Sequence, residues 1–122
     1  MAGLTNAESA ATLDARFPTT GGTDYVAYST DGSSEFAGLA RTAIGATGWA
    51  AATTADPSVK ANSGTITSDA ATDAGTVSHF AIFSASTGGT QRTDWTALDT
   101  ARTLVVGDSL SWAAGALSVT LT

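Results

Sequence analysis

The stretch Thr76–Ser84, TVSHFAIFS, has the alternation on which the fold class depends. In a β-strand successive side chains point to opposite faces, so residues two apart share a face. Phe80 and Ile82 fall on one parity, whereas Val77 before them falls on the other. We therefore predict a strand that either has a bulge near Ser78 or is buried on both faces.

The residues after this stretch continue the β pattern. Gly88–Gly89 and Gly107–Asp108 are typical turn pairs, and short strand candidates lie between and beyond them. In Ala116–Leu121 the larger apolar residues alternate with small or polar ones. Leu117, Val119 and Leu121 therefore share one face of the predicted strand. From Thr76 onward the sequence therefore predicts short strands that end in a C-terminal hairpin.

Upstream of Thr76 the strand candidates are less regular. Asp24–Thr30 and Gly48–Thr53 are predicted strands, and Ser34–Ile44 is a third with imperfect alternation. Ala55–Ser63 is predicted as a loop because it contains an Asp-Pro pair, and a further short strand follows it. With seven to nine short strands in total, the predicted fold is mostly β, a single β-sandwich or jelly-roll-like domain with one short N-terminal helix.

The strong helix signal lies near the N-terminus. Thr5 and Glu8 have the spacing of a capping box, Leu13 and Phe17 recur at helical spacing, and Pro18 ends the segment. A helix of about twelve residues is too short to be stable alone, so its apolar face must dock on the protein's own sheet or on a neighbouring subunit. The predicted division is an N-terminal helix and arm, residues 1–22, and a β domain, residues 23–122, which together form one structural unit.

Composition and charge exclude several classes of function. The 122 residues are the size of one ordinary domain, and the absence of cysteine excludes disulfides and thiolate metal sites. Eleven acidic against five basic residues give a net charge of −6, which argues against nucleic-acid binding. Neither a membrane span nor a secretory signal is predicted, so we expect no membrane partner and synthesis in the cytoplasm. The low charged fraction, 13%, favours contacts between protein copies.

Residues with catalytic or metal-binding potential are few. His79 is the single histidine, and the alternation of a strand is expected to point its neighbour Ser78 to the opposite face, so that the two cannot pair. Asp69 and Asp73 are four residues apart, whereas calcium loops carry their ligands at alternate positions. We therefore predict no catalytic residue, no metal site and no cofactor.

Aromatic residues supply the remaining candidates. Trp49, Trp95 and Trp112 lie in different predicted segments, and with the two tyrosines they could form a platform for stacking sugars. Such residues are more often core or interface anchors. The residues predicted for a protein interface are Leu4, Leu13, Phe17, Trp95 and Trp112.

Several segments, in a consistent order, match a known pattern. Gly75–Phe83 is similar to "GTVTHFALF", and Val105–Leu117 is similar to "V-x-x-GD-x-L-x-F-AAGAL". The further matching segments are Leu4–Ala7, Tyr25–Tyr28, Leu39–Arg41, Asn62–Ser63 and Thr87–Gly89. With these segments the chain resembles small virion proteins of tailed bacteriophages and prophages, which carry tail-fibre or head-decoration labels.

The resemblance implies a non-enzymatic structural protein of the virion. The first expectation is a capsid decoration (cement) protein, bound in many copies to the major capsid protein on the outer capsid surface. The alternative is a tail-fibre, adaptor or receptor-facing module whose partners are tail proteins, and the third is a carbohydrate-binding module. Both virion roles imply a homo-oligomer that is located in the virion and binds no nucleic acid.

Overall fold

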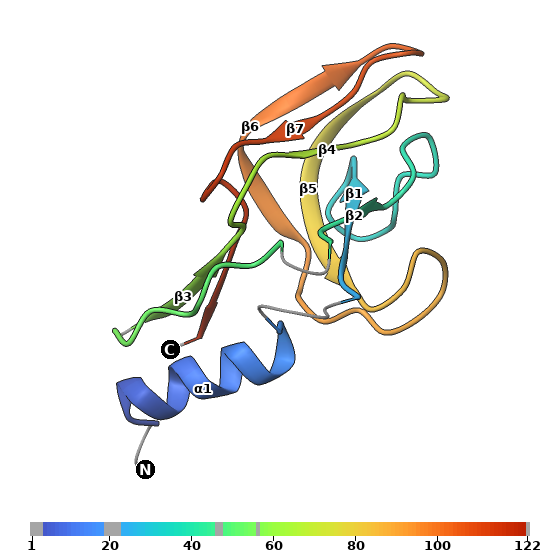
Figure 1. Ribbon diagram of the computed structural model, residues 1–122. Helices are drawn as coiled ribbons and strands as arrows, with labels where there is room; N and C mark the ends of the chain where they lie inside the picture. The colour runs from blue at the N-terminus through green and yellow to red at the C-terminus, as the bar shows by residue number, and fades with distance from the viewer. Residues whose placement is uncertain (1–3, 19–22, 46–47, 56, 122) are drawn as a thin grey trace. The chain divides into compact units, whose positions relative to one another are not determined.

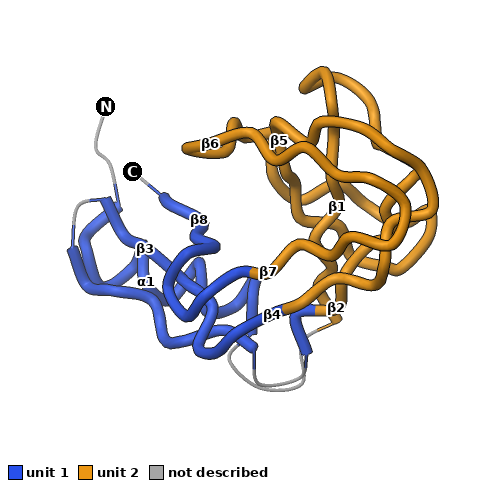
Figure 2. Tube along the Cα trace, turned by 90° about the horizontal axis from the view of Figure 1, so that it is seen from above, with its two compact units in different colours: residues 1–22, 44–66, 112–122 blue, residues 23–43, 67–111 orange. Residues whose placement is uncertain are grey.

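The computed structural model describes residues 4–18, 23–45, 48–55 and 57–121. Within these residues the chain forms one helix and eight strands, which confirms the mostly β fold class (Figure 1). The chain divides into two compact units, which Figure 2 distinguishes by colour. Unit 1 contains residues 1–22, 44–66 and 112–122, and unit 2 contains residues 23–43 and 67–111. Each unit is described by itself, and the sandwich or jelly-roll arrangement stays a prediction.

The helix of unit 1, α1 (Asn6–Arg16), begins at the predicted cap. The Glu8 N–H donates to the Thr5 hydroxyl at 3.2 Å, which satisfies one amide of the first turn. At the other end the Phe17 N–H donates to the Leu13 carbonyl. The helix packs against strands of its own unit, the first of the two predicted alternatives. Residues 1–3 and 19–22 of the predicted arm lie outside the described residues, and the predicted division at residue 22 stays a prediction.

Unit 1 also contains an antiparallel ribbon of β3 (Ser58–Ala61) and β8 (Ser118–Leu121). The ribbon corrects two predictions, because residues 55–63 were expected to be a loop and the last strand was expected to form a hairpin. The segment before β3 supports it, since Val59 accepts a hydrogen bond from the Thr53 N–H through its carbonyl and donates to the Thr53 hydroxyl. Ser58–Ala61 is therefore a strand within the predicted loop, whose residue 56 lies outside the described residues, and the partner of β8 lies far away in sequence.

Unit 2 is built on a four-stranded antiparallel sheet with the order β2-β1-β5-β6. The β5–β6 register shifts between Val77 and His79, near the predicted bulge, and the extra residues belong to β6. Residues of both parities of β5 are buried, as the other predicted alternative requires. Val77 and Ile82 are fully buried in the core. The strand bounds are β1 Tyr25–Ser29, β2 Thr42–Ala43, β5 Gly75–Phe83 and β6 Thr96–Leu104.

Two strands of unit 2 differ in length from the prediction. The strand expected over residues 34–44 shrinks to the two residues of β2, because the Phe36 N–H bonds back to the Tyr28 carbonyl and the chain turns there. β6, in contrast, extends over nine residues, although only the apolar run after Arg102 carried a strand signal. Pairing with β5 stabilises β6 despite its polar sequence.

Two short strands lie where the chain passes between the units. β4 (Ile66–Thr67) pairs with β7 (Ser111–Trp112). Among the described residues, no helix has the length and apolar character that crossing a membrane requires.

Candidate functional site

The predicted interface residues differ widely in exposure. Leu4 is 56% exposed, whereas Leu13 and Phe17 are buried in unit 1. Trp95 in unit 2 and Trp112 in unit 1 are half-buried. Leu4, Trp95 and Trp112 therefore keep surface that a partner can reach, and the interface at these residues stays a prediction.

Phe17 and Trp49 form the aromatic centre of unit 1. Their ring centroids lie 5.6 Å apart at an interplanar angle of 63°, the edge-to-face geometry that aromatic pairs prefer. Trp49 is only 1% exposed. A partner contact at Leu13 or Phe17 would have to open this packing, so the structure gives no support to the interface prediction for these two residues.

An ion pair joins α1 to the ribbon of unit 1. The Lys60 Nζ lies 2.7 Å from the Asp14 Oδ1, and the Lys60 side chain is completely buried. The Ala52 N–H donates to the same carboxylate oxygen at 3.0 Å. The hydrogen bonds from Lys60 and Ala52 hold the pKa of Asp14 below its ordinary value. Sequence reasoning missed this pair, although the lone lysine of the chain was a signal.

Asn62 organises the turn that precedes β8. Its Oδ1 accepts a hydrogen bond from the Leu117 N–H at 2.9 Å, and its Nδ2 donates to the Gly64 and Ala113 carbonyls at 2.7 and 2.9 Å. Its backbone carbonyl accepts from the Gly115 N–H at 2.9 Å. One buried side chain thus satisfies backbone groups on two segments that are far apart in sequence.

In unit 2, Arg41 joins three elements through four hydrogen bonds. Its Nε and Nη2 donate to the two Glu35 carboxylate oxygens, each at 2.9 Å. Its Nη1 donates to the carbonyls of Ala85 and Gly88, each at 2.8 Å. The guanidinium also lies over the Phe83 ring, 4.0 Å from its centroid. This is the bidentate and stacked geometry that an arginine, and not a lysine, can supply.

The same cluster carries a half-buried tryptophan. Trp95 lies against Phe83 with ring centroids 5.9 Å apart. Arg41 holds the loop of residues 84–90, and two hydrogen bonds close this loop. The Ser84 N–H donates to the Thr90 carbonyl at 3.0 Å, and the Thr90 N–H donates to the Ser84 hydroxyl at 2.8 Å. We call Glu35, Arg41, Phe83 and Trp95 the Arg41 cluster; it holds an exposed loop and an aromatic side chain in a defined position.

The structure corrects the prediction that Ser78 and His79 cannot pair. The Ser78 Oγ lies 2.7 Å from the His79 Nδ1. The β5–β6 ladder is irregular at this point, and the two side chains meet although they are neighbours in sequence. The far side of the imidazole packs on Gly32, where an added Cβ would lie only 2.9 Å from Nε2. No carboxylate among the described residues orients the ring, so the pair lacks the third group that an activated serine needs.

The other chemical candidates stay apart or lie in the core. Asp69 and Asp73 are both exposed, and no group of three His, Asp or Glu residues that could hold a metal is found in the described parts of the chain. Tyr28 and Trp49 are buried in different units. The five aromatic residues therefore give no common platform for a sugar within either unit.

Comparisons with known proteins give a family match over nearly the whole chain. The family model described as "Podophage GP4 fiber I protein gp80" matches residues 4–120. No curated protein matches the chain significantly. The matched range includes the described parts of both units up to β8.

Proposed function

The chain belongs to the family of the podophage GP4 fiber I protein gp80, and on this premise we propose that it is a non-catalytic structural subunit of a phage fibre. It is a bacteriophage virion structural protein with a mostly β fold. Among the predicted roles, the tail-fibre alternative agrees with the family description. The observation that carries the proposal is the match over residues 4–120, and it places the fibre role ahead of capsid decoration.

The Arg41 cluster supports a role in holding a surface rather than in chemistry. Arg41 is 7% exposed in its side chain and connects Glu35 to the backbone of the 84–90 loop. A loop that is held in one conformation loses little entropy when it contacts another protein. Trp95 stands beside this loop as a half-buried aromatic residue, the type that dominates protein interfaces. We propose the loop and Trp95 as the surface that contacts other tail proteins.

The Ser78–His79 pair gives the enzymatic reading little support. The pair lies where the β5–β6 ladder is irregular, and the His79 ring packs against Gly32. In the fibre proposal the protein is located in the virion, is present in several copies and has tail proteins as its neighbours.

Labelling of purified virions with an antibody against this chain tests the proposed location. Gold particles are expected on the tail and its fibres, and a virion preparation from a phage that lacks the gene serves as the control. Label confined to the head would contradict the fibre role and would restore the capsid decoration expectation. Quantitative mass spectrometry adds a second criterion, because a decoration protein must be present in many copies per particle.

A further inference from the structure

β6 is the outer strand of the unit 2 sheet and is exposed over most of its length. Of its nine residues only Leu104 is buried. An edge of this length presents backbone N–H and C=O groups with which another strand can pair. Monomeric proteins commonly protect such edges with proline or lysine, and β6 contains neither.

The middle of β6 is loosely paired on its inner side as well. Val77 pairs with Arg102, and His79 pairs with Ala97. Residues 98–101 of β6 therefore lie opposite Ser78 alone. Because four residues of β6 lie opposite one residue of β5, this part of β6 has no regular hydrogen-bond ladder to β5.

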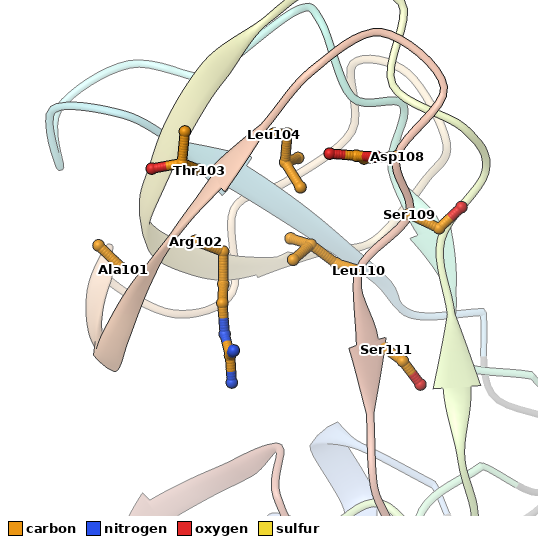
Figure 3. Close-up of a pocket in the computed structure, with 8 residues that line it drawn as sticks. All are labelled: Ala101, Arg102, Thr103, Leu104, Asp108, Ser109, Leu110 and Ser111. Carbon is orange, nitrogen blue, oxygen red and sulfur yellow. The ribbon is translucent and has the colours of Figure 1, made fainter.

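An open pocket of about 560 Å³ lies beside the second half of β6 (Figure 3). One wall is Ala101–Leu104 and the other is Asp108–Ser111. The second wall is hydrogen-bonded to a segment other than β6, since the Leu110 carbonyl accepts a hydrogen bond from the Ser68 N–H at 2.7 Å. Figure 3 shows the Leu104 and Leu110 side chains directed into the space between the walls. The outer edge of β6 therefore faces an open pocket.

We propose that two copies of this chain pair through the outer edges of β6, antiparallel, with Ala101 opposite Ala101 of the partner subunit. Leu98 then lies opposite Leu104 of the partner subunit, beside the pocket of that subunit. The other opposed pairs are Asp99 with Thr103 and Thr100 with Arg102.

Charge and side-chain parity select this register. In a two-fold antiparallel pair that continues a sheet, one residue faces its own copy at the centre. A centre at Asp99 or Arg102 would oppose like charges, which destabilises a strand pair. A centre at Thr100 would oppose Leu98 to Arg102, and a centre at Thr103 would leave Leu98 outside the paired strands. Only the centre at Ala101 opposes small neutral residues and also pairs the two leucines.

Two features favour a second copy as the occupant of this edge. Residues 98–101 lack a regular ladder on their inner side. In the proposed dimer they would pair with Ala101–Leu104 of the other copy, which line its pocket, and each copy would make the same contact. β6 carries one acid and one base, Asp99 and Arg102, so it is neutral in a chain of net charge −6. Pairing through β6 therefore adds no repulsion between the strands. The inference concerns the purified protein and does not depend on where the chain sits in the virion.

Cysteine cross-linking tests the register, because the chain contains no cysteine of its own. In the Ala101→Cys variant the two thiols would lie on directly opposed residues, about 4.5–5.5 Å apart at Cα, which is within disulfide range. In the matched control, Thr103→Cys, the two substituted residues would lie four residues away from each other along the paired strands, about 13 Å apart. We expect mild oxidation to give at least ten times more disulfide-linked dimer with Ala101→Cys. Equal yields, or no dimer from either variant, would overturn the proposal.

A charge-swap experiment tests the interface without a covalent bond. Ala101 is exposed, so its replacement leaves the fold of unit 2 in place, as circular dichroism can verify. Ala101→Asp would place like charges across the two-fold axis and is expected to weaken the dimer at least tenfold in sedimentation equilibrium. Mixing Ala101→Asp with Ala101→Lys should then restore association as a heterodimer. A wild-type chain that stays monomeric at high concentration, or an Ala101→Asp dimer of unchanged affinity, would refute the interface.

Discussion

Arg41 makes four side-chain hydrogen bonds and one ring contact in unit 2. Its guanidinium donates hydrogen bonds to both carboxylate oxygens of Glu35 and to two carbonyls of the 84–90 loop. It also stacks on the Phe83 ring. Because these contacts require a planar group with several fixed donors, no other residue type can replace it. The cluster therefore explains at the level of one residue how a glycine-containing loop is kept in place.

Replacing Arg41 by lysine should loosen the 84–90 loop while unit 2 stays folded. The ammonium can keep one contact to Glu35, but it cannot also reach both loop carbonyls, so we expect a loss of roughly 1–3 kcal/mol in the free energy of unfolding. Hydrogen exchange at residues 84–90 should accelerate. Arg16→Lys on the exposed last turn of α1 is the matched control, and an equal effect there would contradict the role given to Arg41.

Asn62 offers a second test at the residue scale. In the Asn62→Asp variant, an oxygen replaces the Nδ2 donor and faces the carbonyls of Gly64 and Ala113. We expect a loss of roughly 2–4 kcal/mol, because one oxygen of the buried carboxylate would face two carbonyls and no donor, which is costlier than one lost hydrogen bond. Urea denaturation measures the difference. Asn6→Asp, at the exposed start of α1, should be neutral or slightly stabilising, and a similar loss there would count against the account.

At the scale of elements, α1 is held to its unit by an apolar face and one ion pair. Leu13 and Phe17 are buried, and Asp14 lies beside them on the helix to receive Lys60. The Lys60 side chain is fully buried, so removal of the Asp14 carboxylate would take away a group that compensates its charge. The pair thus ties the position of the helix to the β3 strand that carries Lys60.

The Asp14 pair gives a pH dependence whose sign follows from its pKa. The pKa of Asp14 is lower in the folded state than its ordinary value of 3.8, so the carboxylate stabilises the fold above that value, and the contribution is lost as the pH falls through the lower, folded pKa. Compared with Asp14→Asn, the wild type should be more stable by about 1–2 kcal/mol near pH 7, a figure reduced because Asp14 is partly exposed. The gap should close below pH 3.8.

Denaturation of both chains between pH 2 and pH 7 measures this gap. Other carboxylates, including Asp31, whose pKa is also lowered, titrate in both chains and cancel in the difference. Asp69→Asn, at an exposed position with no ion pair shown, is the control and should show no gap at either pH. A gap that stays constant down to pH 2 would contradict the assigned role of Asp14.

The sequence could predict those elements whose signal is local. The cap at Thr5, the strands around Tyr25–Ser29 and Gly75–Phe83, and the irregularity near Ser78 all follow from spacing or alternation. β3 and β6 could not be predicted in the same way, because Ser58–Ala61 and the polar part of β6 form strands only when a distant strand supplies the hydrogen bonds. The Arg41 cluster was missed for a similar reason, since Arg41 reaches Phe83 and the 84–90 loop only through long-range contacts.

At the scale of the whole molecule, the chain consists of two units whose stability rests on burial and satisfied polar groups. Unit 1 is centred on Trp49 and Leu117, and unit 2 on Tyr28, Val77 and Ile82, all of which are almost fully buried. The buried charges that are described are paired, Lys60 with Asp14 and Asp24 with Arg92. The match to the phage fibre family over residues 4–120 includes residues of both units. A structural role in the virion fits a chain in which Asn62 and Arg41 hold backbone segments in place.

Cryo-electron microscopy of the intact virion tests the fibre role most directly. We expect density at the tail fibres into which unit 1, with α1 on the β3–β8 ribbon, and unit 2, with its four-stranded sheet, each fit as separate bodies. Side-chain density for Trp49 and the Arg41 cluster would identify the chain. Density for these units on the outer capsid surface, with none at the fibres, would contradict the fibre role.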